Sequence, residues 1–342
     1  MSPQLLAPTL AASLLVPLLA AAATLPKTMQ AMAMDHPGGP EVVTMHTLPV
    51  PKPAADEVLI ALHTAGVASW DIGSRRNPAD LKHYAVPFVL GTDGAGVIVA
   101  KGARVQGFRI GDQVYSYSWD NPQGGFYAQY VAVPAERVGH VPTGLTLTQA
   151  GAIGTTALTA IQGIDDALHV GRGSSLIIHG AAGGVGTLAV QFAKWRGARV
   201  LATVSGEDEM AAVKALGADV VVDGKHADIP AAARAFAPNG IDAVLILAPG
   251  AAQEQCMAAV RSGGLAAYPT GVHPPPKARE GVRLIRYDAI PGPQEFARLN
   301  EAIAAVHLIV PIAAEFPLAE AAQAQQRLEA GHVQGKIVLN MP

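Results

Sequence analysis

Cysteine is almost absent from this chain of 342 residues, since Cys256 is the single one. One cysteine excludes an internal disulfide and a zinc site built from several thiolates. Cys256 lies in a helical pattern beside Met257, so we interpret it as a packing residue rather than a nucleophile. A single cysteine also fits a reducing compartment.

Charged and aromatic residues are scarce as well. Charged residues make up 15% of the chain, aromatic residues 5%, and the formal net charge is −3. Such a chain offers no strongly basic surface to nucleic acid and no excess charge for an acidic substrate. We therefore expect a small-molecule substrate and no nucleic-acid partner.

Several catalytic patterns are missing. The sequence contains no GxSxG motif, no tyrosine followed four residues later by lysine, and no HxxxH pair among its eleven histidines. No residue is assigned as the catalytic group, and water is expected to supply any proton. The remaining interpretation is that a bound cofactor carries the chemistry while the protein orients the reactants in a dry pocket.

A strand, a tight loop and a helix are predicted at residues 174–195. A β-branched run precedes the glycine-rich segment Ala181-Ala182-Gly183-Gly184-Val185-Gly186, and an apolar pattern with helical spacing follows it. Ala181, Gly183 and Gly186 occupy the three positions of the GxGxxG dinucleotide fingerprint, and a second apolar run at 199–204 follows. We interpret this loop as a cofactor site; the alternative is a purely structural turn.

The rest of the chain divides into a β-rich half and an alternating half. Residues 29–144 contain strand-like runs such as 57–62, 94–100 and 127–133, punctuated by glycine and proline. After a helical stretch at 150–170, strands and helices alternate, which predicts an α/β fold with a doubly wound parallel sheet. The segments expected in this second half are a helix at 208–217, strands at 219–222, 243–247 and 264–268, helices at 295–306 and 318–331, and a closing strand at 336–339.

The N-terminal segment 5–23 is uncharged and rich in leucine and alanine. It resembles a signal peptide, but no basic residue precedes Lys27, and Pro8 and Pro17 interrupt the run. Three interpretations stay open: an extension of a cytoplasmic protein, which we favour, a leader for export to the periplasm, and a membrane anchor. Membrane contact is expected only in the last case.

A series of motifs in order and spacing resembles the medium-chain dehydrogenase/reductase superfamily, and within it the zinc-free quinone oxidoreductase branch. The motifs are 89–97 (VLGTDGAGV), 105–114 (VQGFRIGDQV), 124–131 (GGFYAQYV), 158–160 (LTA), His179 with the fingerprint, 216–219 (LGAD) and 335–338 (GKIV). The resemblance implies a GroES-like β-rich catalytic domain and a Rossmann domain. The implied boundaries are a leader at 1–28, the catalytic domain at 29–152, the Rossmann domain at 153–291 and a return to the catalytic domain at 292–342.

The resemblance also places the positions that hold catalytic zinc in other members of the superfamily. These positions carry Ala68, Thr92 and Thr155, none of which replaces a thiolate or an imidazole at a tetrahedral zinc site. We therefore expect no metal.

The choice of nicotinamide is predicted from the end of the second strand. Val204 stands where relatives that use NAD carry an acid, and Ser205 matches a hydroxyl that binds the 2′-phosphate in the quinone reductase branch. Glu209 stands where that branch commonly has lysine; it belongs either to the nucleotide site or to an acidic first turn favoured by the helix dipole. The prediction is NADPH, with a reduced preference over NADH.

The remaining site residues follow from the resemblance. Thr159 is expected at the nicotinamide carboxamide, or alternatively as a helix-interior threonine bonded to its own backbone, and Tyr268–Val272 beside the nicotinamide ribose. Trp70, Asp71 and Thr92 are expected at the substrate pocket; a core role for Trp70 and a cap role for Asp71 are the alternatives. Arg75 and Arg76 would attract a polar substrate tail or be solvated. The predicted cofactor-binding set is Thr159, Ala181, Ala182, Gly183, Gly184, Val185, Gly186, Thr203, Ser205, Thr270, Gly271 and Val272.

The function implied by these observations is an NADPH-dependent, zinc-independent reductase that transfers hydride to a quinone or an α,β-unsaturated carbonyl. The alternative is a non-catalytic nucleotide-binding or sensing protein of the same fold. The segment 282–287 follows the last predicted strand of the parallel sheet and is expected either to extend that sheet across a homodimer or to end it as a charged edge.

Overall fold

The computed structural model describes residues 25–77, 86–122 and 124–342, so the apolar segment 5–23 and the predictions made for it lie outside the described residues. In chain order the strands are β1 (Thr28–Met34), β2 (Thr44–Pro49), β3 (Glu57–Val67), β4 (Phe88–Val89), β5 (Asp93–Lys101), β6 (Gln113–Tyr117), β7 (Tyr130–Pro134), β8 (Val138–His140), β9 (Ser175–His179), β10 (Arg199–Val204), β11 (Val220–Asp223), β12 (Ile241–Ile246), β13 (Val260–Pro269), β14 (Arg283–Tyr287), β15 (Ile312–Pro317) and β16 (Lys336–Asn340). The helices are α1 (Ser69–Arg76), α3 (Leu147–Gly151), α4 (Gly154–Gln162), α5 (Gly184–Trp195), α6 (Glu207–Ala215), α7 (Ile229–Phe236), α8 (Ala251–Ala259), α9 (Pro293–Val306) and α10 (Ala321–Glu329).

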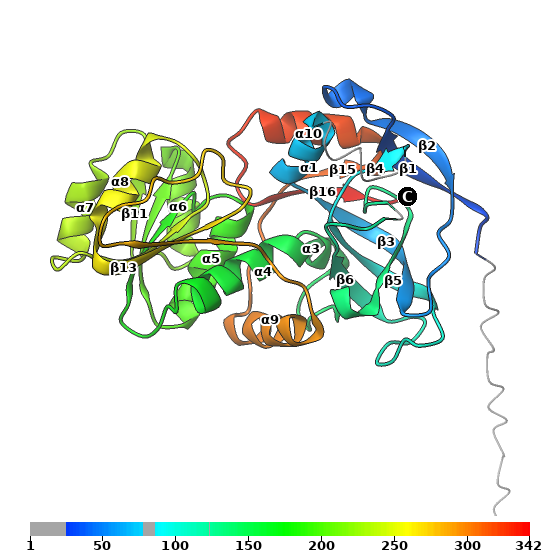
Figure 1. Cartoon of the computed structure of the whole chain (residues 1–342), viewed down its shortest axis with the longest axis horizontal. Helices are drawn as coiled ribbons and strands as arrows, with labels where there is room; N and C mark the ends of the chain where they lie inside the picture. Colours follow the sequence, from blue (N-terminus) through cyan, green and yellow to red (C-terminus); the bar gives the residue numbers. More distant parts are fainter. Residues whose placement is uncertain (1–24, 78–85, 123) are drawn as a thin grey trace, which may run out of the picture.

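One lobe is built around a six-stranded parallel sheet, which lies in the green and yellow half of Figure 1. Its strand order is β11-β10-β9-β12-β13-β14, so the chain adds strands on one side of β9 and then on the other. Alternate residues of β9 enter separate cores: Leu176 and Ile178 pack in the core that contains α5, and Ile177 in the core that contains α7 and α8. Successive side chains of a strand point to opposite faces of the sheet, so both sets are buried only when helices cover both faces. The doubly wound sheet predicted from the alternating pattern is therefore confirmed.

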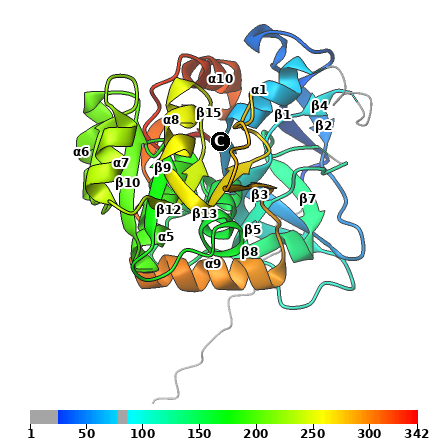
Figure 2. The ribbon, with the colours of Figure 1, turned by 60° about the vertical axis from the view of Figure 1, so that its left-hand side comes forward.

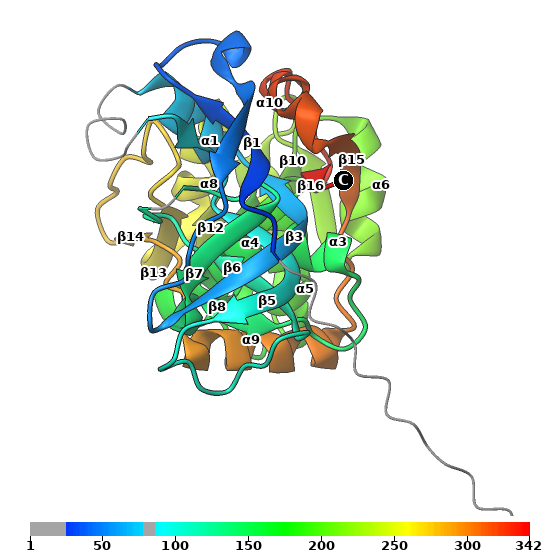
Figure 3. The ribbon, with the colours of Figure 1, turned by 90° about the vertical axis from the view of Figure 1, so that its right-hand side faces the viewer.

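The other lobe contains a seven-stranded sheet and a three-stranded sheet. The first has the order β15-β16-β3-β5-β6-β8 with β7 paired to β3, and the second has the order β2-β1-β4. The C-terminal strand β16 pairs antiparallel with β3, which brings the end of the chain back to this lobe (Figure 3). The mixed α/β fold with a β-rich GroES-like half is confirmed.

Helix α9 fastens the two lobes together. It runs beneath both of them (Figure 2), and Phe296 meets the ring of Tyr115 edge to face, with 5.1 Å between the ring centroids. The hydroxyl group of Tyr115 on β6 also donates a hydrogen bond to Asn300. Leu299 and Ile303 of α9 also belong to the same core as Phe192 of α5, so this helix contacts both lobes, between which a cofactor and a substrate would meet.

The predicted elements differ from the structure mainly at their ends. The helical stretch expected at 150–170 is interrupted: α3 ends at Gly151, α4 begins at Gly154, and a π-turn covers Gly163–Ala167. The segment 282–287 forms β14, which lies parallel to β13 at the edge of the sheet. Among the described residues, none of the helices combines the length and the apolar character needed to cross a bilayer.

Candidate cofactor and substrate site

The loop between β9 and α5 lies where the order of the parallel sheet reverses. Gly180 leaves β9 with φ of 81°, a left-handed conformation that favours glycine, and Gly183 caps α5 without a side-chain bond. A Cβ atom on Gly186 would lie 2.3 Å from the carbonyl oxygen of Gly180. This helix is therefore packed against its own entry loop as closely as glycine permits, and its N-terminal end points to the carboxyl edge of the sheet.

These residues fit a dinucleotide. A pyrophosphate needs a loop without side chains in its way and a helix N-terminus with unpaired N–H groups, at the crevice where the strand order reverses. A Cβ atom on Gly183 would touch only the oxygen of Gly180, at 3.5 Å, so the backbone can be approached there. Ala181–Gly186 would hold the phosphates, as the sequence predicts.

Thr203 and Thr159, two further predicted cofactor residues, both bond to protein groups. The hydroxyl of Thr203 on β10 lies 2.7 Å from Nδ1 of His179 on β9, and burial lowers the pKa of that histidine to about 4. Thr159 lies within α4 and donates its hydroxyl proton to the carbonyl of Thr155, at 2.8 Å. The helix-interior bond weighed as an alternative for Thr159 is thus present, although its oxygen can still accept a bond.

The segment after β13 reaches the same edge of the sheet. The hydroxyl of Thr270 donates to Asp288, at 2.8 Å, and accepts from Arg286. Gly271 has open space around its α-carbon. Val272 packs into the core beside α7 and α8, so this residue offers a cofactor its backbone rather than its side chain.

Ser205 and Glu209 meet where β10 ends and α6 begins. The carboxylate of Glu209 accepts a bond from the backbone N–H of Ser205, at 2.8 Å, and lies 3.1 and 3.2 Å from the serine hydroxyl. The sequence places Ser205 at a phosphate-binding position, but in the structure both of its donors are directed to a carboxylate.

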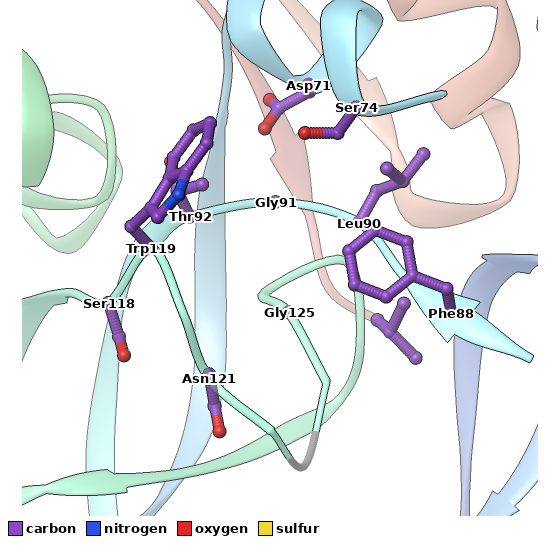
Figure 4. Close-up of a pocket in the computed structure, with 11 residues that line it drawn as sticks. Asp71, Ser74, Phe88, Leu90, Gly91, Thr92, Ser118, Trp119, Asn121 and Gly125 are labelled. Carbon is purple, nitrogen blue, oxygen red and sulfur yellow. The ribbon is translucent and has the colours of Figure 1, made fainter. Parts of the chain in front are cut away.

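A pocket in the β-rich lobe contains two of the three predicted substrate residues. Asp71 and Ser74 come from α1, and Thr92 follows β4 (Figure 4). Trp70 is not among the residues that line it, but its indole Nε1 donates to Thr92, at 2.8 Å. The sequence did not identify the other lining residues, which are Phe88, Val89, Leu90, Gly91, Ser118, Trp119, Asn121 and Gly125. Trp119 stands between Ser118 and Asp120 in the sequence, and this aromatic residue in a polar stretch was the signal that could have found them.

Asp71 is buried between α1 and the pocket. Its Oδ2 accepts bonds from the backbone N–H of Ala68, at 2.9 Å, and from the hydroxyl of Tyr127, at 3.0 Å, while Oδ1 has no partner. Burial raises the pKa of Asp71 to about 7, and the neighbouring Asp93 adds to the rise. The bond from Ala68 shows that the cap role and the pocket role, weighed as alternatives, coexist in this residue.

Two of the three positions that carry zinc ligands in other members of the superfamily are close to each other. The hydroxyl oxygens of Thr92 and Thr155 lie 3.5 Å apart, and Ala68 is bonded through its N–H to Asp71. Within the described part of the chain, no three His, Cys, Asp or Glu side chains are grouped so that they could hold a metal ion. The absence of zinc nevertheless stays a prediction.

Arg75 does not have either of the roles weighed for it. Its side chain is completely buried and bonds to Gly38, Gln325 and Glu329, so it pins α1 to α10 instead of facing substrate or solvent. Arg76 is exposed and shares Glu329. Sequence alone could not distinguish the two, because their environments are set by α10, far along the chain.

Lys336 is a buried residue for which the sequence predicts no role. Its Nζ donates to the carbonyl of Val67, at 3.2 Å, and lies 5.7 Å from the ring centroid of Trp70. The carbon chain passes so close to the fingerprint loop that a Cβ on Gly184 would lie 2.7 Å from it. Gly335 also donates to Ala182, at 2.9 Å. The GKIV segment thus joins the cofactor loop to the substrate side.

The interpretation of Cys256 as a packing residue agrees with the structure. The thiol is buried beside Met257 in the core under α8, and burial raises its pKa to about 12. A thiol protonated at neutral pH is a poor nucleophile.

Known proteins resemble this chain over most of its length. The family described as zinc-binding dehydrogenase matches residues 216–339, and the alcohol dehydrogenase GroES-like domain matches residues 54–143. Alcohol dehydrogenase 1 of Emericella nidulans is 30% identical over 363 residues, which cover 93% of this chain and 99% of that protein.

Solved structures agree. The quinone oxidoreductase from Coxiella burnetii has a TM-score of 0.83 and 28% identity, over 92% of this chain and 100% of that one. A mycobacterial protein solved in complex with NADPH has a TM-score of 0.79 and 30% identity, over 91% of this chain and 99% of that one.

Proposed function

The chain belongs to the medium-chain dehydrogenase/reductase superfamily and is quinone oxidoreductase-like, and from this premise we propose that it is a zinc-independent reductase of quinones or α,β-unsaturated carbonyls. Its relatives support oxidoreductase activity with a nicotinamide cofactor. The single observation that carries this proposal is that the three metal-ligand positions hold the methyl group of Ala68 and the hydroxyl groups of Thr92 and Thr155, the latter two 3.5 Å apart.

Activated acceptors follow from that arrangement. When bound, the reduced nicotinamide supplies a hydride. A plain ketone accepts a hydride readily only if a Lewis acid or a strong proton donor stabilises the negative charge that develops on its oxygen, and oxidation of an alcohol needs the same stabilisation of the oxygen. A quinone or enone, in contrast, already has an electron-poor carbon. Trp70 donates to the oxygen of Thr92, and the proton of the Thr92 hydroxyl can turn from the long 3.5 Å contact with Thr155 to the oxygen of an acceptor.

The walls of the pocket suit a flat, uncharged molecule. Phe88, Leu90 and Trp119 offer apolar surface (Figure 4), and Asp71 is largely protonated below pH 7 and so adds little negative charge there. Helix α9 and the GKIV segment hold the two lobes together around the site. Water from the open side of the pocket would protonate the reduced acceptor.

The cofactor preference has support in both directions. Ser205 at the position of a phosphate-binding hydroxyl and the neighbour solved with NADPH favour the NADPH of the sequence prediction. The bonds from Ser205 to Glu209 oppose NADPH.

We also propose a cytoplasmic location, because a nicotinamide-dependent reductase relies on the cytoplasmic pool of reduced cofactor.

Steady-state assays with 1,4-benzoquinone, a conjugated enone and a primary alcohol test the proposal. We expect turnover of the first two and little oxidation of the alcohol; robust alcohol oxidation would overturn the proposal.

Trp119→Ala should raise KM for benzoquinone, since it removes one wall of the pocket. Trp195→Ala, which removes a partly exposed tryptophan from α5, should leave KM unchanged. Tight nucleotide binding without turnover of any acceptor would favour the alternative, a nucleotide-sensing protein.

A further inference from the structure

The contact between Ser205 and Glu209 bears directly on which nicotinamide dinucleotide the site accepts. In the parallel sheet, Thr203 on β10 pairs with His179 on β9, so the end of β10 lies beside the fingerprint loop. In a Rossmann fold the end of this second strand is where the adenosine ribose is read, through its 2′-hydroxyl or its 2′-phosphate. Ser205 and Glu209 are therefore at the ribose position if the site binds a dinucleotide.

Glu209 is held firmly in this place. Its side chain is only 4% exposed, and its carboxylate accepts from both donors of Ser205. Because Gly206 is the N-cap of α6, Glu209 is the third residue of the helix, and a carboxylate there reaches back over the first turn as in a capping box. The orientation follows from the helix start, so it does not depend on a ligand.

The charges around Glu209 favour a neutral ligand over an anion. Among the ion pairs of the described residues, Glu209 takes part only in one with His332, whose Nδ1 lies 3.9 Å away. Glu207 and Asp208 precede it in the same turn, and Asp223 stands across from Val204 on β11. Asp223 is itself paired with His226, and Asp208 accepts a bond from Gln334.

We propose that Glu209 makes this site prefer NADH to NADPH, by accepting a hydrogen bond from the ribose 2′-hydroxyl and repelling a 2′-phosphate. A hydroxyl can donate to a carboxylate, whereas a phosphate brings further negative charge and only acceptor oxygens. The serine donors that a phosphate would use are already bonded to Glu209. The acid thus comes from α6 and not from the strand end, where the chain has Val204.

This proposal rests on the proposed function, since it presumes that a nicotinamide dinucleotide binds. The test measures equilibrium dissociation constants for NADH and NADPH, by nicotinamide fluorescence and by calorimetry, on the full chain and on three variants. Glu209→Gln keeps the size of the side chain and removes its charge. Glu209→Lys places a cation there, and Glu207→Gln removes an exposed charge from the same turn as a matched control.

We expect the wild type to bind NADH at least about tenfold more tightly than NADPH. Glu209→Gln should bring the two constants within about threefold, mainly by strengthening NADPH binding, and Glu209→Lys should reverse the preference. Glu207→Gln should change the ratio by less than about twofold, because the charge of this exposed side chain is screened by solvent. Thermal unfolding of each variant establishes that it is folded, and ADP-ribose with its 2′-phosphorylated form repeats the comparison without the nicotinamide.

Three results overturn the proposal, and the first two separate it from the proposed function. Tighter binding of NADPH than of NADH by the wild type, or an unchanged ratio in both Glu209 variants, refutes the role of Glu209 and leaves a nicotinamide-dependent enzyme standing. A wild type that binds neither nucleotide refutes both.

Discussion

Replacing Asp71 by asparagine should abolish one pH-dependent component of stability. The carboxyl of Asp71 ionises near its ordinary value of 3.8 in the unfolded chain, whereas burial raises its pKa to about 7 in the fold. Between these values the folded state holds a proton that the unfolded state has released. The free energy of unfolding therefore falls as pH rises from about 4 to about 7 and is constant with respect to this group above that range.

The size of the effect follows from the difference between the two pKa values. A difference of about 3 units corresponds to roughly 4 kcal/mol, at about 1.4 kcal/mol for each unit. Asparagine has the shape of the protonated acid, and its amide oxygen can still accept from Ala68 and Tyr127. The variant should match the wild type near pH 4 and exceed it in stability by several kcal/mol at pH 8.

Denaturant unfolding of both proteins at pH 4, 5, 6, 7 and 8 measures this difference. Asp56→Asn is the matched control, because Asp56 is exposed and pairs with Arg104 on the surface, at 3.3 Å. Its stability relative to the wild type should vary with pH by less than about 1 kcal/mol. If the gap between Asp71→Asn and the wild type is the same at pH 5 and pH 8, Asp71 is not protonated in the fold and the reasoning fails.

Four further outcomes are expected. Gly186→Ala places a Cβ 2.3 Å from the oxygen of Gly180, so nucleotide binding should weaken by about tenfold or more, while Gly171→Ala, with open space around it, should bind normally; equal binding by both would contradict the close packing of the loop. Arg75→Met should cost about 3 kcal/mol or more in denaturant unfolding, because it removes the charged partner of the buried Gln325 and one of the two arginines that pair with Glu329, and Arg76→Met should stay within about 0.5 kcal/mol. Metal analysis should find no stoichiometric zinc, and activity should survive chelation; zinc lost together with activity would refute the assignment. Light scattering should give twice the chain mass of 35.1 kDa if β14 extends the parallel sheet across a two-fold axis, and a monomer mass would exclude that dimer.

Local sequence was sufficient for the elements of the parallel sheet. The run at 174–179, the fingerprint and the run at 199–204 gave β9, α5 and β10 almost to the residue. Each of these elements is specified by neighbours in sequence: β-branched residues for the strand, glycine for the turn and apolar spacing for the helix. The wrong expectations concern contacts between distant segments, of which Arg75 on α1 and its partners on α10 are the clearest example.

The sequence by itself determined the fold class, the place of the nucleotide loop and the residues at the zinc positions, because these depend on local patterns and on residue identity. Tertiary structure alone decided that Asp71 is buried with a raised pKa, that Trp119 and Thr92 line the same pocket, and that Glu209 turns back to Ser205. The reason is physical: a pKa and the direction of a side chain depend on which atoms surround the group, and those atoms come from strands and helices that are adjacent only after the chain has folded.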